Sequence, residues 1–135
     1  MKQRITIIFG VLYFFHQISV SAQVGTWENV GGDISGPSAN AILKMGSDVY
    51  VGGSFWGAAG VSGADNIVRW DGLQWVALGE GLNGTVNDMV FVGNDLYVGG
   101  FFEDAGGDPN ADFLARWNGV SWSAVGTGVS GYVDA

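Results

Sequence analysis

Short apolar runs, each bounded by glycine, asparagine or aspartate, follow one another along the second half of the chain. They are rich in Val, Tyr, Phe and Trp, the residue types that are favoured in β-strands. Between them, Gly93-Asn94 and Asn118-Gly119 supply residues that accept a positive φ, which predicts tight hairpin turns. The pattern therefore predicts four short antiparallel strands, at 88–92, 96–102, 114–117 and 122–125.

The first half of the chain repeats this pattern. Tyr50 and Tyr97 are 97 − 50 = 47 residues apart, and at that offset roughly 20 of the 48 aligned pairs between 41–88 and 88–135 are identical. A fixed period of this length indicates a repeat architecture. The expected strands of the first copy are 41–45, 48–55, 67–70 and 75–78, with turns at Gly46-Ser47 and Asp71-Gly72.

Four strands in each period of about 40–50 residues are typical of a β-propeller blade. A single blade cannot bury both of its faces, so consecutive blades must stack against each other. Both copies contain a diglycine in their second strand, and we expect the bare backbone there to be covered by a neighbouring tryptophan ring. The fold class predicted from the sequence is all-β: an incomplete propeller of two four-stranded antiparallel blades.

The repeated residues resemble kelch repeats of the galactose-oxidase-like propeller type. The resemblance rests on the diglycines and on two tryptophans per repeat, and the run Tyr-Val-Gly-Gly-x-Phe is similar to tandem repeats of secreted bacterial proteins. Because catalytic groups seldom recur in every blade, we expect a structural role for the residues that recur in both copies. These are Gly52, Gly53, Gly99, Gly100, Trp70, Trp75, Trp117, Trp122, Arg69 and Arg116; recurring Asp48, Asp95, Asp65 and Asp112 are expected in ion pairs or turn caps.

The expected organisation follows the repeats. Residues 39–85 form blade 1 and 86–128 form blade 2, while 129–135 are the start of a missing third blade. Residues 23–38 hold an isolated strand, near Trp27, that belongs to a neighbouring blade, followed by a linker. Because propellers use about 4–8 blades, we expect either the N-terminal piece of a longer protein or an oligomer that closes the ring.

The first 22 residues have the make-up of a secretory signal peptide. Lys2 and Arg4 precede an apolar run from Ile5 to Phe15, and small residues end at Ala22. A membrane anchor is the alternative, but the run is shorter than the ~20 residues that a spanning helix needs. We therefore expect a signal helix, cleavage before Gln23, and a protein that is secreted or at the cell surface, not in the membrane.

Composition excludes several classes of function. The chain has no cysteine, and its one histidine, His16, lies in the expected signal peptide, which excludes Ser-His-Asp, Cys-His and copper-oxidase chemistry after cleavage. The expected mature chain has three cations and thirteen acids, a charge of 3 − 13 = −10. That charge disfavours nucleic acids as partners. A carboxylate pair such as Glu103 and Asp104 has no feature that would raise an acid's pKa.

Candidate binding residues lie in the long connections, which we expect at one end of the blades. Trp56 and Glu103 occupy equivalent, non-repeated positions, and Trp56 is either a packed loop aromatic or a sugar platform. Asp108-x-Asn110-x-Asp112 resembles the start of a calcium loop but lacks its glycine and distal glutamate; a solvated acidic loop is the alternative. The candidate ligand residues are Trp56, Glu103, Asp104 and Asn110, and the candidate calcium ligands are Asp108, Asn110 and Asp112.

These observations favour a non-catalytic extracellular segment that binds protein or carbohydrate. No cofactor is expected, and calcium is the one metal for which the sequence offers candidate ligands. Two alternatives stay open. The repeats can be the scaffold of a larger secreted enzyme, or the chain can be a two-blade lectin that oligomerises. The fold is the stronger prediction, because one propeller architecture serves many functions.

Overall fold

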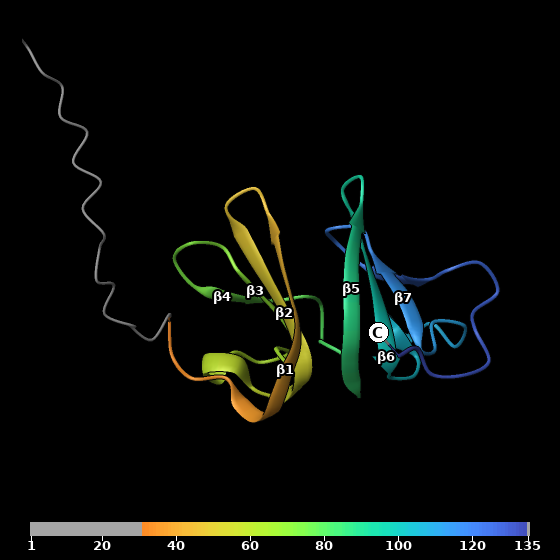
Figure 1. Cartoon of the computed structure of the whole chain (residues 1–135), viewed down its shortest axis with the longest axis horizontal. Helices are drawn as coiled ribbons and strands as arrows, with labels where there is room; N and C mark the ends of the chain where they lie inside the picture. Colours follow the sequence, from red (N-terminus) through yellow and green to blue (C-terminus); the bar gives the residue numbers. More distant parts are fainter. Residues whose placement is uncertain (1–30, 135) are drawn as a thin grey trace, which may run out of the picture.

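The computed structural model describes residues 31–134. They form two four-stranded antiparallel sheets that lie side by side, so the all-β class and the two separate sheets are confirmed (Figure 1). The two sheets do not close into a ring. The expected signal helix and the strand near Trp27 lie outside the described residues.

The first sheet has its strands in chain order, each hydrogen-bonded to the next. A short 3₁₀ turn, η1 (Ala58–Gly60), lies in the connection between its second and third strands. The strands are β1 (Ser35–Met45), β2 (Asp48–Trp56), β3 (Ile67–Trp70) and β4 (Trp75–Ala77).

The second sheet repeats this arrangement, with η2 (Ala105–Gly107) in the place of η1. Its register is that of the first sheet, since Tyr97 pairs with Arg116 as Tyr50 pairs with Arg69. The identical pairing shows that the sequence period is a structural period. The strands are β5 (Thr85–Val92), β6 (Asp95–Phe101), β7 (Leu114–Trp117) and β8 (Trp122–Ala124).

The first strand of each sheet begins earlier than the sequence predicts. β1 starts at Ser35 instead of residue 41, and β5 starts at Thr85 instead of residue 88. Both extensions contain irregular pairing, as between Val86 and Asp88. A bulge places an extra residue in one strand, which interrupts the alternation that reveals a strand in a sequence.

The largest part of the core lies between the two sheets. Tyr50 from β2 and Met89 from β5 are buried there, and the Tyr50 ring meets the Phe91 ring edge-on at 5.1 Å between centroids. Leu43 and Met45 of β1 pack against the same core. In Figure 1, β5 lies beside β1 and β2. This inter-sheet core fixes the second sheet on one face of the first.

The diglycines are not covered by tryptophan rings, and that expectation is wrong. A Cβ added to Gly52 would stand 2.5 Å from Val86 Cγ1 and 3.0 Å from Met89 Sδ, so side chains of the next sheet cover Gly52. A Cβ on Gly53 would collide with the Ser38 carbonyl of β1. Gly52 therefore admits the neighbouring sheet, and Gly53 admits the neighbouring strand.

The tryptophans instead form pairs within each sheet. Trp70 and Trp75 meet at 5.3 Å, and Trp117 and Trp122 at 5.1 Å, between ring centroids. The second pair lies 3.5 Å from where a Cβ of Gly79 would stand, and Trp122 Nε1–H donates to the Leu78 carbonyl at 2.8 Å. The first pair packs against Gly31, which precedes β1, and the second pair packs against Gly79, which follows β4.

Candidate functional site

The long connections of the two sheets meet at the sheet junction. Residues 79–83 lead from β4 to β5, and residues 103–107 open the connection from β6 to β7. Together with Asp65, Trp117 and residues 120–122 they line a cavity of about 650 Å³, which we call the inter-sheet groove. The groove therefore combines recurring residues (Asp65, Trp117 and Trp122) with non-repeated loop residues such as Asn83 and Glu103.

The two sides of the groove are joined by a hydrogen bond. The Glu103 backbone N–H donates to Asn83 Oδ1 at 2.9 Å, which connects the loop of the second sheet to that of the first. A second bond fixes the loop itself, because the Asp104 N–H donates to Asp112 Oδ1 at 2.8 Å. These hydrogen bonds from backbone to side chain hold the groove loops in place. Ligand binding therefore requires little further ordering of the loops.

The charged side chains that line the groove are all acidic. Glu80 lies on the side of the first sheet, and Glu103 and Asp104 lie on the side of the second. Trp117 is partly buried and contributes an aromatic surface to the lining, while Trp122 is buried. Carboxylates accept hydrogen bonds from hydroxyl and amino groups, and tryptophan faces attract sugar rings and cations. This combination suits a polar ligand with hydroxyl or cationic groups.

The calcium candidates lie in the same connection but outside the groove lining. Asp108 Oδ2 accepts the Ala124 backbone N–H at 3.0 Å, and Asp108 Oδ1 accepts the Asn110 N–H at 3.0 Å. These bonds, that to Ala124 first, hold the pKa of Asp108 below its usual value. Asp108 thus caps the edge strand β8.

Asp112 is a cap as well, and its counterpart does the same in the first sheet, where Asp65 Oδ1 accepts the Gly57 N–H at 2.6 Å. Residues 31–134 contain no group of three His, Cys or acidic side chains placed to hold a metal ion. Calcium binding at Asp108, Asn110 and Asp112 stays a prediction, and it would compete with two backbone caps.

Trp56 is not part of the groove. It ends β2 with its side chain 62% exposed, at the position that Glu103 occupies after β6. The structure therefore separates the two predicted ligand residues, one on the loop of each sheet. An exposed ring at this place is available for stacking, whereas a packed loop aromatic would be covered.

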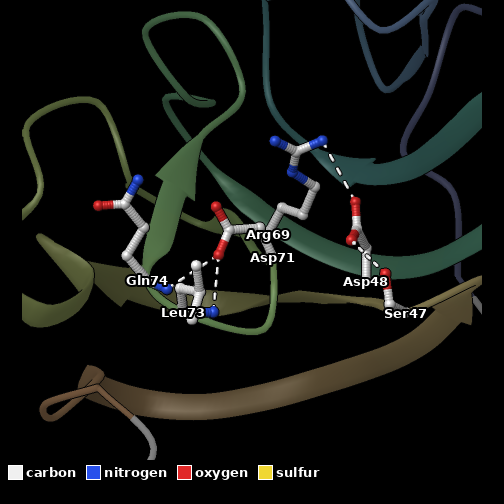
Figure 2. A network of polar contacts seen from close by, with 6 residues as sticks. All are labelled: Ser47, Asp48, Arg69, Asp71, Leu73 and Gln74. Atoms are coloured by element: carbon white, nitrogen blue, oxygen red, sulfur yellow. Dashed lines mark hydrogen bonds and ion pairs between the residues drawn. The ribbon is translucent and has the colours of Figure 1, made fainter.

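The recurring charged residues form one ion pair in each sheet. Arg69 Nη1 lies 3.3 Å from Asp48 Oδ2, and Arg116 Nη1 lies 3.5 Å from Asp95 Oδ2. Figure 2 shows the first pair beside the turn that Asp71 caps. All four side chains are partly exposed, so each pair contributes at most about 1 kcal/mol. These contacts are within the sheets and away from the groove.

Sequence reasoning missed asparagines that connect neighbouring segments: Asn40 joins the two sheets, and Asn87 joins the second sheet to the C-terminal residues. Asn40 Nδ2 donates to the Val86 carbonyl at 2.8 Å, and Asn87 Nδ2 donates to the Val133 carbonyl at 2.8 Å. The recurrence of this asparagine is visible in the sequence, because Asn40 and Asn87 are 87 − 40 = 47 residues apart, which is the repeat period. Asn83 has no such signal, since the equivalent position is Gly36.

None of the helical segments in the described part of the chain has the length and apolar character that a bilayer crossing requires. In comparisons with known proteins, no family model matches the chain, and no curated protein or solved structure matches it either.

Proposed function

We propose that this chain is a non-catalytic, exported repeat segment that binds a protein or carbohydrate ligand in the inter-sheet groove. Its two sheets are, in this proposal, consecutive blades of a kelch-type β-propeller. The observation that carries the binding function is the groove itself. Its volume of about 650 Å³ falls in the range of about 300–1,000 Å³ that is usual for ligand sites.

Two features support binding over catalysis. The groove residues that could react are the exposed carboxylates Glu80, Glu103 and Asp104. A carboxylic acid that serves as a general acid typically lies in an apolar pocket, whereas these three side chains are exposed. Non-repeated residues around a repeated frame are instead typical of loops that recognise a ligand.

The proposal is tested first with the ligand classes it names. A glycan array probes the carbohydrate arm, and a displayed library of random peptides probes the protein arm. Each ligand found is then titrated into ¹⁵N-labelled protein, and we expect amide shift changes at residues 79–83 and 103–107. If both screens are blank, or if the shifts map elsewhere, the groove is not the binding site.

A matched pair of variants links binding to the groove. Val120 lines it, and Leu73 is the equivalent turn residue of the first sheet, away from it. Both side chains are more than four-fifths exposed, at 83% and 89%, so neither change should affect folding. We expect Val120→Ser to weaken binding about 3–10-fold and Leu73→Ser to leave it unchanged. Equal effects would contradict the assignment.

A further inference from the structure

The outer face of the second sheet, turned away from the first sheet, exposes apolar residues in a regular pattern. Val90 and Val92 of β5 are 54% and 62% exposed. Their equivalents one repeat earlier are Leu43 and Met45, which pack into the inter-sheet core. The second sheet therefore exposes the residues that the first sheet uses to hold its neighbour.

The C-terminal residues already occupy part of this face. A Cβ on Gly99 would stand 2.7 Å from Val133 Cγ1, as a Cβ on Gly52 would stand 2.5 Å from Val86 Cγ1. Asn87 also donates to the Val133 carbonyl at the same distance at which Asn40 donates to the Val86 carbonyl. Since 133 − 86 = 47, Val133 lies where the first strand of another sheet would begin.

A third contact between the two sheets has no equivalent, among residues 31–134, at the outer face of the second sheet. Gly79 follows β4 and lies against Trp117 and Trp122 of the second sheet. Gly126 follows β8 at the equivalent position, and among residues 31–134 nothing lies within 4 Å of where its Cβ would stand. A tryptophan pair from a further sheet would fill this place.

We propose that the outer face of the second sheet, formed by Val90, Val92, Tyr97 and Gly99, is a docking surface for another four-stranded sheet of this repeat. The first strand of that sheet runs through residues 132–134. Its apolar side chains cover Val90 and Val92, and its tryptophan pair covers Gly126. The proposal is independent of ligand binding in the groove, because it uses the opposite face of the second sheet.

A second copy of the chain fits this face less well. Its residues Ser38–Asn40 would have to occupy the place that residues 132–134 already fill. In addition, Lys44 is the equivalent of Phe91, so a lysine would replace the aromatic ring that meets Tyr50 in the internal junction. The expected partner is therefore a sheet continuous with residues 132–134.

The test extends the full chain by one repeat in register. A second copy of residues 89–135 is fused directly after Ala135, which is the equivalent of Asp88. We expect a single urea transition at a higher midpoint than that of the parent chain. Hydrogen exchange at the amides of residues 133 and 134 should slow by at least about tenfold, because a fraying end becomes an internal strand.

The control is the double substitution Val90→Lys/Val92→Lys in the original repeat. Both side chains are exposed in the parent chain, so its midpoint should change little, whereas the extended chain should lose its gain. Two separate transitions, or a gain that survives the lysines, would overturn the proposal. A discrete oligomer of the parent chain that the lysines dissociate would also overturn it, in favour of a second copy.

Discussion

At the scale of single residues, the two repeats place different side chains at equivalent positions that have the same backbone conformation. Ala59 and Gly106 are equivalent, and both adopt a left-handed conformation, with φ of 51° and 67°. This conformation strains a residue that has a Cβ, whereas glycine adopts it freely. At this position the first repeat therefore carries a local strain that the second avoids, whereas at the equivalent Gly57 and Asp104 the second repeat carries it.

We expect Ala59→Gly to increase the free energy of unfolding by up to about 1 kcal/mol, the left-handed strain less the entropy cost of glycine. Gly106→Ala should decrease it by about 1–3 kcal/mol, because its Cβ would also stand 2.8 Å from Trp122 Cβ. Urea denaturation of the two variants measures both effects. Destabilisation by Ala59→Gly together with a silent Gly106→Ala would contradict the assigned strain.

At the scale of the elements, the turn between the third and fourth strands occurs in a charged and a neutral form. Asp71 Oδ1 accepts the N–H groups of Leu73 and Gln74 at 2.8 and 2.9 Å, as Figure 2 shows. Asn118 Oδ1 accepts the equivalent pair, from Val120 and Ser121, at 2.9 and 2.8 Å. One geometry is thus capped by a carboxylate in one sheet and by an amide in the other.

The charged form should make the first turn sensitive to acid. The N–H groups of Gln74 and Leu73 lower the pKa of Asp71 below 3.8, so its contribution to stability is present above pH 3.8 and is lost as the pH falls through the lowered pKa. We expect Asp71→Asn to leave the melting temperature at pH 7 nearly unchanged and to reduce its fall between pH 5 and pH 2 (roughly the range over which such a carboxylate is protonated).

The reciprocal substitution is the control. Asn118→Asp should keep the turn at pH 7 and add acid sensitivity to the second sheet, since the same two N–H groups would face a carboxylate. Thermal unfolding of both variants over the same pH range gives the comparison. Identical pH profiles for the wild type and both variants would show that these turns do not contribute to acid sensitivity.

The strands were predictable from the sequence where their signal is local. β3 and β7 have the predicted bounds, because short runs rich in apolar residues end at the Asp71-Gly72 and Asn118-Gly119 turns. The early parts of β1 and β5 were not predictable, since bulges interrupt the alternation there. The groove was predictable only as one end of the blades, because Asn83 joins its two sides and has no repeated counterpart.

At the scale of the whole molecule, the contact between the sheets was the hardest feature to predict. The diglycine and the tryptophans were recognised as structural, but their partners were assigned wrongly. Gly52 meets Val86, and Trp122 meets Leu78 and Gly79. Such pairings depend on how two sheets are placed, which no residue pattern within one repeat specifies.

The close approach of Gly52 to Val86 predicts a compensating pair of substitutions. Gly52→Ala should lower the free energy of unfolding by about 1–3 kcal/mol, because the added Cβ would stand 2.5 Å from Val86 Cγ1. Val86→Ala should also destabilise, by about 1–3 kcal/mol, since a fully buried side chain loses two methyl groups. The double variant should be more stable than the sum of the two effects, because the smaller side chain admits the added methyl group.

The size of this coupling tells whether the contact between Gly52 and Val86 holds the two sheets together. Urea denaturation of the wild type, the two single variants and the double variant measures it. We expect a coupling of about 1 kcal/mol. Gly99→Ala is the matched control: it adds the same methyl group against Val133, which lies in a short C-terminal segment that can yield, so it should cost less than Gly52→Ala. Additive effects at Gly52 and Val86 would mean that the sheets adjust independently, and the junction would then not be the rigid frame on which the groove and the outer face both depend.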